Sequence, residues 1–278
     1  MAKGLIPLFL TASIVLAAVP AGATIGSLIS SFDIPASYYG YGILAQGNYI
    51  YLSGDLTYGD YLLTYTHSGS LVRSRAIDPG NSSPLYGGSR THLGEGYIAL
   101  IDGNTNYLKI FSIANGGAPV ASFSTNSGRW NVFWDGEYYY LNRTSQAGVF
   151  IRRTTIGAYA GTWTCAGWPS GMTLCMGAAY AQYGNNAAGP YFVAGAGNPN
   201  QPCCMTTFPG GSLVATWSRP SPYLSHISYG DSSNPSTYGA AIWGTTSSPY
   251  EVYEIDIDAR GASLIMPSSL GKIRATYR

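Results

Sequence analysis

Two histidines, His92 and His226, stand at nearly equivalent places, just ahead of a Gly-containing turn, in two similar segments of the chain. Histidine can transfer protons at physiological pH because its pKa ordinarily lies near neutrality. If both side chains point toward a common axis, they predict proton-transfer chemistry of the lyase type. The alternative is that each histidine is packed, or bonded to a backbone carbonyl. The third histidine, His67, lies beside a glycine turn and is predicted to be a surface residue.

Carboxylates offer a second kind of chemistry. Glycoside hydrolysis needs two or three of them around one site, and Asp33 and Asp78 are the acids that could face such a site. Most of the other acidic residues fall in hairpin turns or late strands. Asn131 stands where a metal ligand could lie, but no acidic partner accompanies it, so we predict neither metal nor cofactor. The chain also has no G-x-S-x-G elbow, phosphate loop or HExxH helix.

The composition narrows the class of protein. Of the 278 residues, 10% are charged and 46% are hydrophobic, and glycine (36) and tyrosine (24) are abundant. A chain with so little charge has no electrostatic footprint for nucleic acid, and it has enough apolar residues to bury a core. Tyrosine favours strands and glycine favours turns, so we expect many short strands.

The first 23 residues resemble a secretory signal peptide. Lys3 precedes the apolar run LIPLFLTASIVLAAV, and small residues end at Ala23, after which we predict cleavage. The alternative is an uncut membrane anchor, but the run is short and no basic stop-transfer segment follows it. We expect no span after cleavage, and a location outside the cell, in the periplasm or at the cell surface.

Four cysteines remain after cleavage: Cys165, Cys175, Cys203 and Cys204. In an exported chain, disulfides are the default expectation. Two pairings are open. Either the first two cysteines bond to each other and the last two form a strained adjacent pair, or each of the first two bonds to one of the last two. The spacing does not match a zinc site.

One short pattern recurs along the chain. A glycine is followed by a short apolar strand that often ends in an aromatic residue six positions on, and successive glycines are 40 to 54 residues apart. The copies are GSLISSF (26–32), GSLVRSR (69–75), GAPVASF (117–123), GAYAGTW (157–163), GSLVATW (211–217) and, more weakly, GASLIMP (261–267). A period of ~40–50 residues made only of strands is typical of propeller blades.

The intervals between the glycines hold three further strands. An apolar strand, a Gly-containing turn and a second strand come first, as in ILAQGNYIYL (43–52), HLGEGYIALI (92–101) and VFWDGEYYYL (132–141). A third strand follows in each copy, near 60–65, 106–111, 148–153, 202–207 and 250–255. With the Gly-Ser-Leu-Val segment as the fourth, each unit is predicted to be a four-stranded antiparallel sheet.

Such a sheet cannot bury both faces alone, whereas sheets stacked radially cover one another. We therefore predict an all-β β-propeller over 24–267 rather than a β-sandwich, with Trp134 and the tyrosines at 138–140 packing between blades. Five blades are favoured and six are possible, and the copy at 26–32 could close the ring by joining the last blade. Residues 268–278 are predicted to be a last strand or a tail.

The repeats resemble those of secreted bacterial propellers whose blades carry a Gly-Leu-x-Trp-Asp-Gly-x-x-Leu-Trp signature, related to the NHL and YWTD classes. VFWDGEYYY (132–140) matches best and GILAQGNYIY (42–51) comes next. The resemblance covers about residues 26–267 and implies the fold. It does not imply a function, because these repeats encode packing.

The expected function is that of a non-catalytic binding module for an extracellular glycan or protein. Rigid amphipathic aromatic residues in the segments that lead into innermost strands suit such contacts. The predicted binding residues are Tyr38, Tyr39, Tyr41, Arg90, Arg129, Trp130, Asn131, Trp168 and Tyr223. The alternative is a hydrolase or lyase with its site in the axial funnel. The sequence predicts no oligomeric state.

Overall fold

The computed structural model describes residues 25–35, 39–55, 60–81, 83–125, 131–142, 146–182, 189–195, 201–218, 224–230, 241–246 and 251–257. Within them, the side chains at 39–41, 55, 224–225 and 241–246 are not described. Every regular element in these residues is a β-strand. The Gly261 copy of the repeat and the tail from 268 lie outside the described residues.

The described strands form five four-stranded antiparallel units, which we call blades 1 to 5. Blade 1 contains β2 (Tyr39–Gln46), β3 (Tyr49–Asp55), β4 (Asp60–Thr66) and β5 (Leu71–Ala76). Blade 2 contains β6 (Leu85–Ser89), β7 (Tyr97–Asp102), β8 (Tyr107–Ser112) and β9 (Ala121–Ser124). Blade 3 contains β10 (Asn131–Trp134), β11 (Tyr139–Asn142), β12 (Val149–Arg153) and β13 (Tyr159–Thr164). Blade 4 contains β14 (Gly177–Ala181), β15 (Tyr191–Gly195), β16 (Cys203–Thr207) and β17 (Leu213–Trp217). Blade 5 contains β18 (Leu224–Gly230), β19 (Ala241–Thr246), β20 (Glu251–Asp256) and β1 (Leu28–Asp33).

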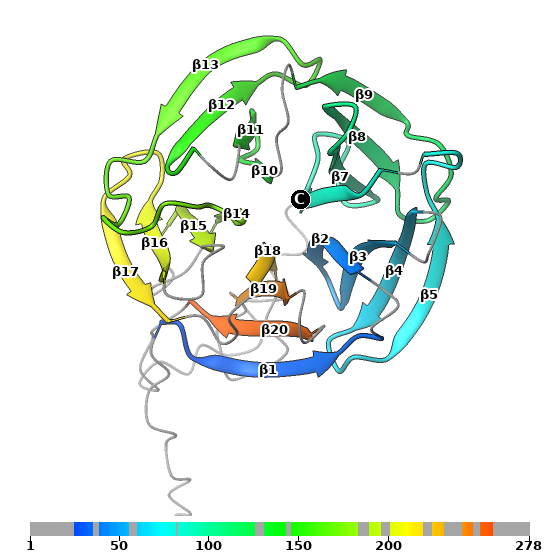
Figure 1. Cartoon of the computed structure of the whole chain (residues 1–278), viewed down its shortest axis with the longest axis horizontal. Coiled ribbons are helices and arrows are strands. Elements are labelled where there is room, and N and C mark those ends of the chain that lie inside the picture. The colour runs from blue at the N-terminus through cyan, green and yellow to red at the C-terminus, as the bar shows by residue number, and fades with distance from the viewer. Residues whose placement is uncertain are drawn as a thin grey trace, which may run out of the picture. The chain divides into compact units, whose positions relative to one another are not determined.

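The blades surround a common axis (Figure 1). Their innermost strands are β2, β6, β10, β14 and β18, and each contacts the next around a closed circle. Blades 1 and 2 are also joined by one parallel pair, Gly42 with Gly87. We call the side of the ring where the innermost strands begin the N-terminal face and the side where they end the C-terminal face.

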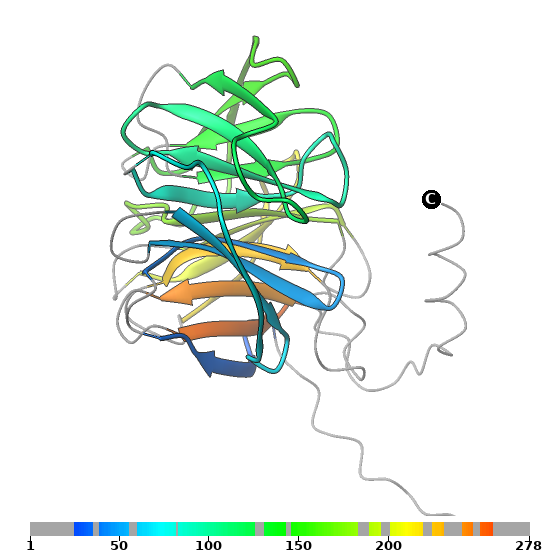
Figure 2. The ribbon, with the colours of Figure 1, turned by 90° about the vertical axis from the view of Figure 1, so that its right-hand side faces the viewer.

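The N-terminal strand closes this circle. β1 pairs antiparallel with β20 from Leu28 opposite Ile255 to Asp33 opposite Glu251, and so becomes the outermost strand of the last blade. Figures 1 and 2 show β1 beside β20 in both views. The prediction that the first repeat copy joins the last blade is confirmed. Residues from opposite ends of the described chain therefore hold one sheet together.

The core lies between the blades. Consecutive tyrosines of β11 point to opposite faces of blade 3, because side chains alternate along a strand. Tyr139 is buried in a cluster with Ile101 and Phe123 of blade 2, whereas Tyr140 is buried in a cluster with Phe192 of blade 4. The other described clusters join blades 1 and 2, 4 and 5, and 5 and 1 in the same way. Each sheet thus buries both faces against its two neighbours, as the repeat predicts.

The recurring glycine and aromatic residue contact each other across these junctions. A Cβ built on Gly69 of blade 1 would lie 2.7 Å from the Cβ of Phe32 in blade 5, and one built on Gly157 of blade 3 would lie 2.6 Å from the Cβ of Phe123 in blade 2. Both glycines have positive φ, of 84° and 82°. Such values are strained for residues with a side chain. At Gly69 and Gly157, and in the same way at Gly26 against Trp217, the repeat therefore marks a steric contact between neighbouring blades, whereas Gly117 and Gly211 keep a positive φ without an aromatic neighbour.

This contact predicts a specific loss of stability. Gly157→Ala should lower the free energy of unfolding by about 2–4 kcal/mol, because backbone strain and overlap with the fixed Cβ of Phe123 add together. Gly117→Ala is the matched control, because Gly117 holds the same place in the repeat with φ of 75° and nothing within 4 Å of its Cβ. The control should lose only about 1 kcal/mol. Urea unfolding measures both, and equal losses would contradict the steric explanation.

Candidate functional site

The axis carries a small polar cluster near the N-terminal face. Tyr86 of β6 and His226 of β18 have ring centroids 6.0 Å apart, and His226 is 2% exposed. Burial lowers the pKa of His226 to about 3. The histidine is therefore neutral at physiological pH and a weak base, which makes it a poor proton acceptor there.

Asn131, at the start of the innermost strand β10, is hydrogen-bonded to the segment that leads into the next blade. It is 1% exposed, and its Nδ2 donates to the carbonyl of Cys175, ahead of β14, at 2.6 Å. Asn131 Oδ1 and His226 Nδ1 have no hydrogen-bond partner among the described residues. The axis thus holds two buried polar atoms that a small polar molecule or water could satisfy.

His92 lies elsewhere. It follows the end of β6, near the C-terminal face, where its Nδ1 is 2.9 Å from the hydroxyl of Tyr139. Its ring also packs against Trp134, with centroids 6.1 Å apart. The expected equivalence of the two histidines is therefore wrong. His226 lies within an innermost strand and His92 lies in the turn after one, so the pair does not share a site.

The two candidate acids are also separated. Asp33 ends β1, the outermost strand of blade 5, because that strand closes the ring from outside. The expectation that Asp33 could face an axial funnel is therefore wrong. Asp78 lies in the connection from β5 to β6, and its Oδ2 accepts hydrogen bonds from Lys109 at 2.5 Å and from Asn81 at 2.8 Å.

A second carboxylate completes this charged group. Asp102, at the end of β7, is fully buried, and its Oδ2 accepts from Lys109 at 2.7 Å and from Asn81 at 3.1 Å. Burial alone would raise the pKa of Asp102, but hydrogen bonds from Lys109 and Thr105 outweigh it and hold the pKa at about 2. Lys109 is thus neutralised by two acids, and the group stabilises blade 2 rather than offering a reactive carboxylate.

The predicted binding residues fall on both faces. Arg90, near the C-terminal face, places its guanidinium carbon 5.8 Å from the centroid of the Tyr229 ring. Trp168, in the connection from β13 to β14, donates from Nε1 to the carbonyl of Met172 at 2.5 Å and packs on Phe192. The side chains of two predicted residues on β2 are not described, and four others lie outside the described residues: Tyr39 and Tyr41, and Tyr38, Arg129, Trp130 and Tyr223.

The four cysteines are buried and form no disulfide with one another, so neither predicted disulfide pairing is present. Cys203 and Cys204 follow each other on β16, which is paired on both sides, so their side chains point to opposite faces. Cys204 lies with Cys165 and Cys175 in the core between blades 3 and 4, whereas Cys203 lies in the core between blades 4 and 5. Burial raises the pKa of Cys165, Cys175 and Cys204, which makes these thiols unreactive.

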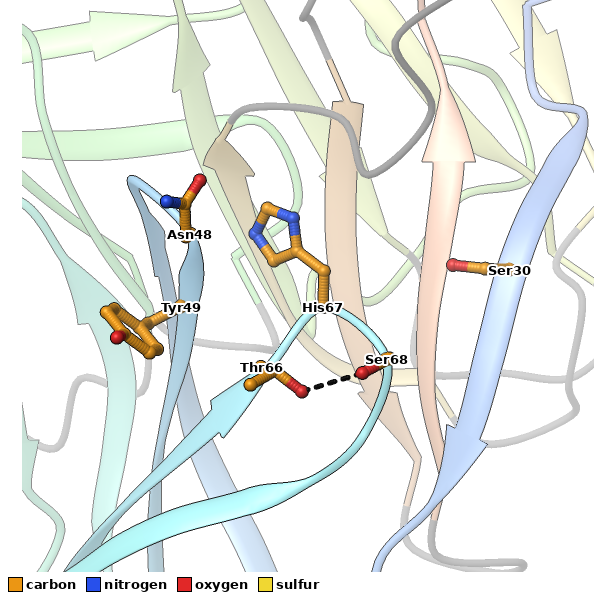
Figure 3. A pocket seen from close by; sticks show the side chains of 6 residues that line it. All are labelled: Ser30, Asn48, Tyr49, Thr66, His67 and Ser68. Atoms are coloured by element: carbon orange, nitrogen blue, oxygen red, sulfur yellow. Dashed lines mark hydrogen bonds between the residues drawn. The ribbon is translucent and has the colours of Figure 1, made fainter.

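A cleft on the C-terminal face was not anticipated from the sequence. It has a volume of about 540 Å³ and is lined by Ser30, Asn48, Tyr49, Thr66, His67 and Ser68. These residues come from the β2–β3 turn, the β4–β5 turn and β1 (Figure 3). The sequence predicts both turns and predicts that His67 is a surface residue, whereas its side chain is partly buried. Only ring closure brings β1 beside the two turns.

The residues that the structure describes contain no group of three or more His, Cys, Asp or Glu side chains that could hold a metal ion. They also contain no helix that is long and apolar enough to span a bilayer.

Comparison with known proteins gives the fold. No protein-family model matches the chain, and no curated protein is similar to it in sequence. The virginiamycin B lyase of Staphylococcus aureus is similar in structure over 82% of this chain and 73% of its own, with a TM-score of 0.41 and 10% identity. The WD40 β-propeller domain of Doa1 is similar over 77% of this chain and 62% of its own, with a TM-score of 0.43 and 13% identity.

The glutaminyl cyclase of Myxococcus xanthus is similar over more of both chains. The similarity covers 86% of this chain and 98% of that one, with a TM-score of 0.61 and 12% identity. At such identity a structural likeness shows the fold alone. Together with the ring of four-stranded sheets, it shows that this chain is a β-propeller.

Proposed function

We propose that the chain is an exported, non-catalytic β-propeller that binds a carbohydrate or a protein outside the cell or at its surface. Its predicted signal peptide at 1–23 supports export, and its repeats support a relationship to the NHL and YWTD classes. The ligand would meet the N-terminal face, where the segments with most of the predicted aromatic residues enter the innermost strands. No nucleic acid partner is expected from a chain with so little net charge.

One observation carries this proposal. Asp33 lies away from the axis, Asp78 and His92 are committed to internal contacts, and burial leaves His226 a weak base at the axis, whereas the connections into the innermost strands vary from blade to blade. They range from residues 34–38 between β1 and β2 to residues 165–176 between β13 and β14. A repeated frame with varied connections on one face is the usual arrangement for binding sites on rigid scaffolds.

The test is a panel of immobilised glycans and peptides probed with the full chain. The triple variant Tyr38→Ala, Trp130→Ala and Tyr223→Ala should bind the retained ligand at least about tenfold more weakly. Tyr159→Ala is the control, because Tyr159 is 63% exposed at the start of β13, on the C-terminal face, and it should bind like the parent. A triple variant that binds as tightly as the parent would refute a role for this face.

A hydrolase or lyase with an axial site is the second candidate. The unpartnered atoms of His226 and Asn131 at the axis favour it, although the low pKa of His226 argues against a general base there. Chemical conversion of a retained ligand by the parent, lost in His226→Leu, would favour the enzyme. Recovery of the ligand unchanged would favour binding alone.

A further inference from the structure

The cleft on the C-terminal face has the chemistry of a sugar site. All of its lining side chains are polar or aromatic, and none belongs to Lys, Arg, Asp or Glu. Its volume is about 540 Å³ and much of its boundary is open to solvent, so a ligand would lie along the surface rather than be enclosed. We propose that this cleft binds a neutral saccharide.

The hydroxyl groups of the β4–β5 turn are held in place before any ligand arrives. Thr66 Oγ1 accepts a hydrogen bond from the backbone N–H of Ser70 at 3.1 Å and lies 2.9 Å from Ser68 Oγ. The turn is also closed by the backbone bond from Gly69 to the Thr66 carbonyl at 3.0 Å. Fixed hydroxyls lose little entropy when they bind, so they favour a ligand that is itself rich in hydroxyl groups.

The opposite wall is fixed by a buried acid. Ser30 Oγ, on β1, donates a hydrogen bond to Glu254 Oε2 at 2.7 Å, and Glu254 is fully buried. With its proton committed to the carboxylate, the Ser30 hydroxyl presents acceptor lone pairs to the cleft. A ligand hydroxyl can donate to it.

An exposed aromatic ring lies at the rim of the cleft: Tyr49 points away from Ser30 (Figure 3), on the face of blade 1 that it shares with Tyr51. Tyr49 is 40% exposed and lies opposite Thr66 in the β3–β4 register, so its ring starts from the same part of the sheet as the cleft hydroxyls. Tyrosine offers an apolar face and a polar tip at low entropy cost. A saccharide of several units that passes over the β2–β3 turn can pack the apolar C–H face of one ring on Tyr49 while the hydroxyls of another ring reach the β4–β5 turn.

The absence of charge in the lining selects among saccharides. An acidic sugar would lose hydration on entering the cleft and would gain no ion pair with the residues that line it. A neutral one exchanges its hydrogen bonds to water for bonds to hydroxyl, amide and imidazole groups. A saccharide that spans the cleft would also contact both β1 and blade 1, which come together only in the closed ring. Its binding should therefore raise the melting temperature.

This site is separate from the one under the proposed function, because it lies on the C-terminal face and does not use the aromatic residues of the N-terminal face. Either proposal can fail without the other. The two are distinguished by variants on opposite faces of the same chain.

The experiment titrates the full chain with cellotetraose, maltotetraose and chitotetraose, followed by NMR and by thermal melting, with tetragalacturonate as the charged comparison. At least one neutral tetrasaccharide should bind saturably and raise the melting temperature, and tetragalacturonate should not. Tyr49→Ala should weaken that binding about tenfold. Asn48→Ala, in the exposed turn, should weaken it as well, whereas Tyr107→Ala, at the exposed start of β8 in blade 2, should stay within about twofold.

Three results would overturn the proposal. The first is no binding of any neutral tetrasaccharide at roughly 10 mM. The second is tighter binding of tetragalacturonate than of all three. The third is binding that survives Tyr49→Ala and Asn48→Ala but is lost in the triple variant of the N-terminal face, which would place the saccharide under the proposed function instead.

Discussion

Acid should destabilise the folded chain through one histidine. Burial lowers the pKa of His226 to about 3, from an ordinary value of 6.5. Below pH 6.5 the unfolded chain binds a proton at this side chain and the folded chain does not, so stability falls as the pH falls. Between pH 7 and pH 4 this group alone should remove about 3 kcal/mol from the free energy of unfolding. That is a large part of a typical total of ~5–15 kcal/mol.

His226→Leu isolates the effect, because leucine has no proton to gain and fills the buried site with apolar atoms. The variant should show a flatter dependence of unfolding free energy on pH between 6 and 4 than the parent in urea titrations. His92→Gln is the comparison. Burial also lowers the pKa of His92, but that side chain is only partly buried, so its removal should change the slope less. Parallel pH profiles for the parent and His226→Leu would show that His226 is not neutral in the folded state.

Removing Lys109 should lower the free energy of unfolding at neutral pH by at least as much as protonation of His226 lowers it in acid. Lys109→Met should lower the free energy of unfolding by about 3–5 kcal/mol, because it leaves the carboxylate of Asp102 buried without its cation. Lys109 bonds to both Asp78 and Asp102, and its own side chain is 14% exposed. Urea unfolding at pH 7 measures the loss. The double variant Lys109→Met with Asp102→Asn carries no stranded charge at Asp102 and should recover a substantial part of it.

The contribution of the Lys109–Asp102 ion pair to the free energy of unfolding should decrease as the pH is lowered. In the parent, the pKa of Asp102 is about 2 instead of 3.8, so its contribution is present above about pH 4 and is lost as the pH falls toward 2. In Lys109→Met, burial should dominate and raise that pKa. The gap between parent and variant should therefore narrow as the pH is lowered from 4 to 2. A variant as stable as the parent at pH 7 would mean that Asp102 finds another partner.

The fold was largely predictable from the sequence because it is a local pattern repeated. The third strands expected near 60–65, 106–111, 148–153, 202–207 and 250–255 are present as β4, β8, β12, β16 and β20. The glycine copies from 69 to 211 give the outermost strands, and the first copy closes the ring. Alternation of polar and apolar residues and turn chemistry act within a few residues, so they can be read from neighbouring letters.

The positions of side chains around the axis were predicted less well. His92 and His226 have similar neighbours in the sequence. However, His226 lies within the innermost strand β18, whereas β6 ends at Ser89 and leaves His92 in the turn that follows. Asp33 follows a strand that looks like any other copy of the repeat, and only closure makes that strand the outermost of blade 5. The adjacent cysteines of β16 face different cores because side chains alternate along a strand and blade 4 is covered on both faces.

The sequence by itself determined the sheets, their order of strands and the need for each sheet to be covered on both faces, because these follow from hydrophobic alternation along each segment. Only the tertiary structure decided which side chains meet across blades. Lys109 joins Asp102 of its own blade to Asp78 in the connection that leads into that blade, and the cleft forms where β1 reaches blade 1. Those contacts link residues far apart in the chain, and their geometry depends on how the whole ring closes rather than on any local pattern.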